Sequence, residues 1–228
     1  MVFLFENLKI LKRTHAVVFT VILAFCVFAS CEKKEITYFK FKKDTLFKDS
    51  LYLVFRGTDT KAGFYAKDFN IKDSLSSHVG IAIYEDCWEI YNVLDFKDDF
   101  SDLRNQKFEE FFDFKKEKIT YGSVWLIQDI DAIDIKRLKE NLLVYKNKKI
   151  SFDKIFSLQD STKLYCSEFI CNLLENTNPS KFSFKLYNRK FKSKSIYGIY
   201  FQKENLSYYP VDIFQYHKNF KKIKEWVN

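Results

Sequence analysis

The sequence predicts an α+β domain whose antiparallel sheet packs against the helix that begins at Cys166. Three observations predict it. Runs with β character recur along residues 49–127, two of them separated by a short polar segment typical of a hairpin. Apolar residues then recur at helical spacing from Ile135 onward. The strand that begins at His78 carries the small residues Gly80 and Ala82, which leave room for the Cys166 helix to pack against it.

The amino-acid composition supports a single ordered domain and excludes several classes of protein. Of 228 residues, 19% are aromatic and only 5 are Gly and 2 Pro, which is unlike a disordered or collagenous chain. Five Cys in this length do not make a disulfide scaffold, and the spacing of His and Cys predicts neither a metal site nor another cofactor. The formal net charge is +8, but no dense basic run accompanies a nucleic-acid-binding motif, so no nucleic-acid partner is expected.

The first thirty residues predict a lipoprotein signal peptide. Basic residues at 9, 12 and 13 precede an uncharged run over 16–30, which is shorter than the roughly 20 residues that span a bilayer. Small residues at positions 29 and 30 stand before Cys31, as in a bacterial lipobox. We expect acylation of Cys31, a tether over 31–48, a single domain over 49–228, and a location in the bacterial cell envelope. A plain cleaved signal or a buried helix is the alternative.

The elements follow in order from local patterns. After the first strand, residues 58–76 are expected to form a loop with one helical turn, and residues 100–114 are loosely helical. A helix is predicted around 135–145 and a second over 166–174, ending near Pro179. Mixed strand and loop are expected over the last fifty residues. The expected strands are residues 49–55, 78–84, 88–94 and 123–127.

Cys166 is placed as a nucleophile would be. It begins a helix whose apolar residues lie at i+3, i+4, i+7 and i+8 from it, so its side chain shares the buried face. Unpaired N–H groups at a helix N-terminus lower a thiol pKa and can stabilise an oxyanion. The alternative is a small buried core residue.

His78 begins a strand and is the candidate base. Its face also holds Gly80 and Ala82, and these small residues leave room for the Cys166 helix. A loop of odd length centred on Glu85 would put Asn92 opposite His78, where it could orient the ring, while a two-residue turn would put Asp95 there. Asn92 is the first choice and Asp95 the second.

Together these motifs resemble a known family. Ser-His-Val-Gly-Ile on a strand, a polar residue on the next strand, and later Tyr-Cys-Ser-Glu-Phe at a helix start resemble the permuted papain-like cysteine hydrolases of the NlpC superfamily, and the YiiX/YebB (YaeF) group within it. The resemblance covers residues 51–174 and implies a circularly permuted papain-like fold. It also implies a Cys166 nucleophile, a His78 base and Asn92 as third group, with Tyr165 as a candidate substrate or oxyanion residue.

The expected activity is that of an envelope-anchored cysteine amidase or peptidase acting on a peptide, such as a cell-wall peptide. Two alternatives remain open: a thioesterase or acyltransferase acting on lipid-like substrates, and a non-catalytic ligand-binding lipoprotein. The membrane, through Cys31, is the other expected partner. The sequence does not predict an oligomeric state.

Overall fold

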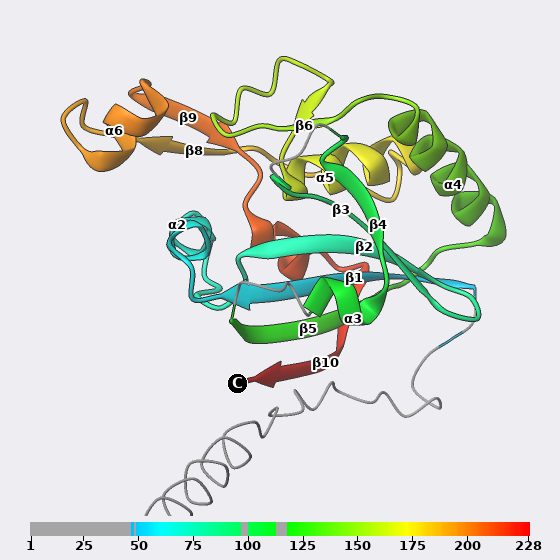
Figure 1. The fold of residues 1–228 in the computed structure, drawn as a ribbon. Helices are drawn as coiled ribbons and strands as arrows, with labels where there is room; N and C mark the ends of the chain where they lie inside the picture. Colours follow the sequence, from blue (N-terminus) through cyan, green and yellow to red (C-terminus); the bar gives the residue numbers. More distant parts are fainter. Residues whose placement is uncertain (1–46, 48, 97–99, 113–117) are drawn as a thin grey trace, which may run out of the picture. The chain divides into compact units, whose positions relative to one another are not determined.

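A computed structural model describes residue 47 and residues 49–96, 100–112 and 118–228 (Figure 1). The chain divides into two units, residues 1–40 and 41–228, and the described residues belong to the second. The predicted signal peptide, Cys31 and most of the predicted tether lie outside them. No helix among the described residues is long and apolar enough to cross a membrane.

The domain is built on a six-stranded antiparallel sheet with the order β10-β5-β1-β2-β3-β4. Its strands are β1 (Ser50–Thr58), β2 (His78–Tyr84), β3 (Trp88–Val93), β4 (Leu103–Gln106), β5 (Ile119–Ile127) and β10 (Phe220–Val227). All of β1 beyond its first residue is buried, because strands flank it on both sides and side chains cover both faces. The α+β prediction with an antiparallel sheet is confirmed.

Two helices, α4 (Ala132–Lys146) and α5 (Cys166–Thr177), pack on one face of this sheet. Apolar side chains of α5, including Phe169 and Leu173, share one core cluster with Val79 and Ile81 of β2. The short helix α3 (Phe108–Phe112) contributes to a second cluster on the other face, together with Ala82.

The prediction that the Cys166 helix packs on the face of His78, Gly80 and Ala82 is therefore wrong. The apolar side chains of that helix pack instead against the larger apolar side chains of the other face, such as Val79 and Ile81, and burial of apolar surface favours this contact. The narrow space above Gly80 is filled by the Phe111 ring, which would lie 3.2 Å from a Cβ at that position.

The remaining elements surround this core. A helix, α2 (Lys61–Asp68), follows β1, and a two-stranded parallel sheet joins β6 (Ser151–Phe152) to β7 (Lys163–Leu164). A small lobe consists of β8 (Tyr187–Lys190), α6 (Ile196–Phe201) and β9 (Asn205–Tyr208). A 3₁₀ turn, η2 (Val211–Tyr216), leads into β10.

Three local predictions need correction. The segment 58–76 contains a full helix, which Thr60 caps by accepting a hydrogen bond from the Gly63 N–H. Residues 100–114 contain strand β4 as well as a helix, because pairing with β3 overrides the loose helical spacing. The C-terminal fifty residues contain strands as expected, among them β10, but they also include the helix α6, whose apolar side packs against residues distant in sequence.

Candidate functional site

His78 and Asn92 form a hydrogen-bonded pair inside the sheet. His78 Nε2 lies 3.0 Å from Asn92 Oδ1, and both residues are buried. Asn92 Nδ2 donates to Gln106 Oε1 at 2.8 Å, which orients the amide with its oxygen towards the imidazole. Because an amide oxygen only accepts, Nε2 carries the ring proton and Nδ1 keeps its lone pair. This is the tautomer that a general base needs.

The hairpin register differs from the one expected. The ladder pairs Ile81 with Tyr91 and Tyr84 with Trp88, so the three-residue loop is centred on Asp86 rather than Glu85. Continued by one residue, this register puts Gly80 opposite Asn92, with His78 diagonal to Asn92 on the same face. Glycine has no side chain to separate them. The second choice, Asp95, forms an ion pair with Lys154 at 2.7 Å instead.

The surroundings of His78 keep its ring neutral. The imidazole stacks on the Phe111 ring at 5.7 Å, and the buried Arg56 of β1 pairs with His78 in the strand register. Burial, followed by the positive charge of Arg56, lowers the pKa of His78 to about 3, and the hydrogen bond that His78 donates to Asn92 offsets only part of this.

Cys166 is the first residue of α5, and its sulfur reaches the backbone of β2. The β2–β3 pairing starts at Ile81, and the N–H of Val79 donates to the Cys166 sulfur. Burial raises the pKa of the Cys166 thiol, against smaller opposing effects of the N–H groups and of Arg56. The expected lowering of this pKa at a helix N-terminus is wrong here, because the thiol is 6% exposed and desolvation exceeds the helix effect.

The three candidate catalytic residues are therefore only partly in contact with one another. His78 and Asn92 are in contact, and Cys166 contacts the residue that follows His78. Within the described residues, no hydrogen bond joins the Cys166 thiol to the His78 ring. The side chain of Tyr165 belongs to a separate aromatic cluster, where its hydroxyl accepts a hydrogen bond from the Tyr209 N–H at 2.8 Å.

A C-terminal segment, which sequence reasoning left without a role, ties the two halves of the site together. On one side, Ser167 Oγ donates to the carbonyl of Tyr209 at 2.7 Å. On the other, the buried carboxylate of Asp212 accepts hydrogen bonds from three successive backbone N–H groups, those of residues 71–73. Gln215 donates to Asp73 at 2.6 Å. Residues 71–77 run directly into His78, so the segment 209–215 joins the Cys166 helix to the His78 loop.

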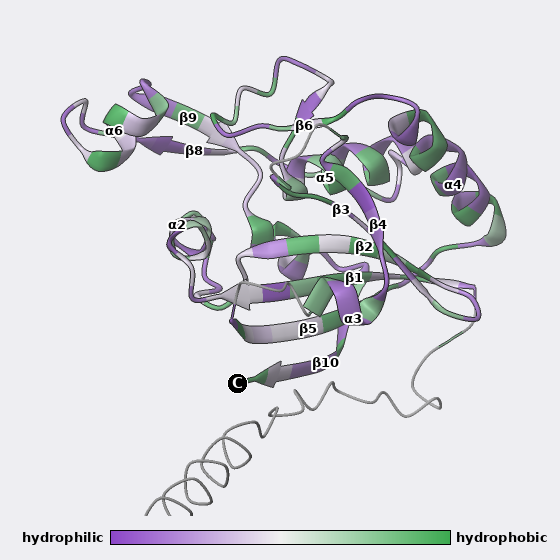
Figure 2. Cartoon of the chain, in the orientation of Figure 1, coloured by the Kyte–Doolittle hydropathy of each residue, from purple (hydrophilic) through white to green (hydrophobic). Residues whose placement is uncertain are grey.

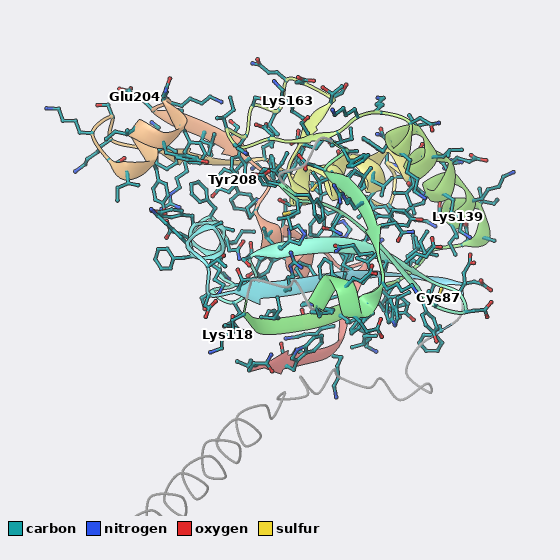
Figure 3. All side chains as sticks on the ribbon, viewed as in Figure 1. Cys87, Lys118, Lys139, Lys163, Glu204 and Tyr208 are labelled. Carbon is teal, nitrogen blue, oxygen red and sulfur yellow. The ribbon has the colours of Figure 1, made fainter. Side chains whose placement is uncertain are left out.

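Other nucleophilic or metal-ligating residues lie apart from this site. Cys87 is exposed at the β2–β3 hairpin tip (Figure 3), and Cys171 is buried within α5. The ring of His217 packs among Phe182, Phe184 and Phe220. In residues 47–228, leaving out those not described, no three His, Cys, Asp or Glu side chains cluster as metal ligands.

Comparison with known proteins yields one structural likeness. No protein-family model matches the chain, and no curated protein matches it. Among solved structures, the fold is similar to that of the metalloprotein YiiX from Escherichia coli O157:H7. The TM-score is 0.57 at 11% sequence identity, over 79% of this chain and 99% of that one.

The fold is YiiX-like. At this identity the likeness concerns the fold alone. That protein is described as a metalloprotein.

Proposed function

We propose that this chain is a cysteine hydrolase of the permuted papain-like type, carried on a bacterial lipoprotein, with Cys166 as nucleophile, His78 as base and Asn92 as orienting group. The observation that carries the proposal is the His78–Asn92 hydrogen bond, which leaves Nδ1 of His78 unprotonated. The residue after His78 on the same strand, Val79, donates its N–H to the Cys166 sulfur. The YiiX-like fold agrees with it.

In the proposed reaction, Nδ1 of His78 takes the thiol proton as the Cys166 sulfur attacks an amide carbonyl. The backbone N–H of Cys166 at the start of α5 stabilises the oxyanion. The C–N bond then breaks, the imidazolium returns its proton to the leaving amine, and water hydrolyses the thioester with the same base. Because thiol and imidazole are both neutral at rest, the proton moves together with the attack on the carbonyl.

The substrate class favoured is a peptide amide, such as a cell-wall peptide. A thioester or a lipid acyl group would fit the same chemistry, since acyl transfer to Cys166 is common to both. The adduct on Cys166 separates them. A peptide acyl mass supports the amidase, and a fatty acyl mass supports the thioesterase or acyltransferase.

A non-catalytic ligand-binding lipoprotein is a second candidate, and burial is the observation that favours it. Cys166 is 6% exposed and His78 5%, and their pKa values shift in opposite directions, away from an ion pair.

Acylation by p-nitrophenyl acetate, followed by acid quenching and peptide mass mapping, tests the choice. We expect acetyl-Cys166 and turnover in the parent. Turnover should be lost in Cys166→Ala and fall by about 10²-fold or more in His78→Ala, the typical contribution of a general base. Cys171→Ala is the matched control, since this buried thiol lies on the same helix, and it should stay active. Equal turnover by Cys166→Ala and the parent would exclude the mechanism.

A further inference from the structure

The small lobe formed by β8, α6 and β9 presents an apolar face that no other described element covers. In helix α6, Ile196, Ile199 and Tyr200 are exposed by 69%, 66% and 59%. Their spacing of i, i+3 and i+4 puts them on one side of the helix. Figure 2 shows hydrophobic segments on α6 beside the hydrophilic strand β8.

The opposite side of α6 is packed inward, so the exposed side chains have a fixed direction. Phe201 is buried in the aromatic cluster around Phe69, and Tyr197 packs against Phe69 at 5.1 Å. Tyr197 Oη also donates to Asp68 Oδ2 at 2.7 Å, and Arg189 of β8 forms an ion pair with Asp68 at 2.9 Å. The lobe is thereby anchored to the end of α2.

Basic residues lie close in sequence to the exposed apolar side chains. The segment 185–203 contains six Lys or Arg and no Asp or Glu. Apart from the paired Arg189 and the half-buried Lys203, the basic residues are exposed lysines: Lys185, Lys190, Lys192 and Lys194. The nearest acidic neighbour along the chain, Glu204, follows directly (Figure 3).

This combination favours one kind of partner. Exposed aliphatic side chains and a tyrosine beside lysines match the interface of an anionic bilayer, where apolar groups enter below the headgroups and lysines contact phosphates. A second copy of this chain fits less well, because a two-fold contact through α6 would bring the lysines of both copies together. Two of the three exposed side chains are isoleucines, which offer no flat ring on which nucleic-acid bases could stack.

We propose that the α6 lobe docks on an anionic membrane, inserting Ile196, Ile199 and Tyr200 at the headgroup boundary. This contact is separate from acylation of Cys31, and it does not rest on the proposed catalytic function. If the chain is lipid-anchored, the lobe would fix which side of the domain faces the bilayer.

The test measures local insertion, so that any attachment through the N-terminal residues does not obscure it. Full-length Ile199→Trp is mixed with vesicles of phosphatidylcholine and phosphatidylglycerol that carry brominated acyl chains, which quench only nearby indoles. The matched control is Leu143→Trp, which replaces another exposed aliphatic residue, 57% exposed on α4. The three native Trp residues give both variants the same background.

We expect extra quenching at position 199 and none at position 143. Replacing both lysines, Lys192→Gln and Lys194→Gln, should lower the affinity for the vesicles by about fivefold per lysine, and the quenching at position 199 should fall accordingly. Quenching that is equal at the two positions, or unchanged in vesicles of phosphatidylcholine alone, would overturn the proposal. So would shielding of position 199 by self-association without lipid. Circular dichroism of each variant confirms that the fold is retained.

Discussion

The contact between Asp212 and the loop before His78 gives a sharp prediction about stability. Asp212 is fully buried, and its carboxylate accepts from the N–H groups of Ile71 at 2.8 Å, Lys72 at 2.9 Å and Asp73 at 3.0 Å. Asp212→Asn keeps the shape but removes the charge and turns an NH₂ group towards these donors. Hydrogen bonds to charged groups are worth roughly 1 kcal/mol more than neutral ones, so three of them predict a loss of about 3 kcal/mol.

Urea unfolding of the parent and of Asp212→Asn measures this difference, and hydrogen exchange reports the three amides directly. We expect a lower free energy of unfolding and faster exchange at residues 71–73. The matched control is Asp129→Asn, an exposed aspartate, which should change the free energy by less than about 0.5 kcal/mol. A loss of less than about 1 kcal/mol in Asp212→Asn, with the amides still protected, would refute the assignment of Asp212 as the anchor of this loop.

Three further predictions concern the site and the sheet. The rate of Cys166 alkylation by iodoacetamide should keep rising through pH 9 without a plateau at lower pH, because burial raises its pKa; exposed Cys87 serves as the reference thiol. Burial raises the pKa of Glu168 from 4.5 to about 7, so its contribution to stability is full below pH 4.5 and is lost as pH rises through 7. In the parent, the free energy of unfolding in urea should therefore fall by an amount on the order of 3 kcal/mol over this pH range, and Glu168→Gln should not show this fall. Gly122→Ala should cost about 2 kcal/mol in the same assay, because a Cβ there would overlap the Trp226 indole.

Each of these has an outcome that contradicts it. A plateau in the alkylation rate below pH 8 would mean that Cys166 is a thiolate paired with His78. If the free energies of unfolding of the parent and Glu168→Gln changed in parallel between pH 4.5 and 7, the pKa of Glu168 would not be raised by burial. His78 has a lowered pKa, so its contribution to stability is lost as pH falls from 6.5 towards 3. This contribution is the same in both proteins and cancels when their free energies of unfolding are compared. An unchanged free energy in Gly122→Ala would show that the indole moves freely.

Local patterns in the sequence were enough to place the candidate residues on their elements. The strand that begins at His78, the helix that begins at Cys166, and the shared face of His78 and Asn92 all follow from periodicity and hairpin parity, which depend only on neighbouring residues. A change in loop centre from Glu85 to Asp86 keeps that parity, because both loops have an odd number of residues.

Tertiary structure decided what surrounds those residues. Which sheet face α5 covers depends on the competing Phe111 ring, and the pKa directions of Cys166 and His78 depend on burial and on Arg56, which comes from another strand. The contact of Asp212 with residues 71–73 spans about 140 positions of sequence. Such contacts leave no periodic pattern, because each arises only when the folded chain brings together side chains and backbone that are distant in sequence.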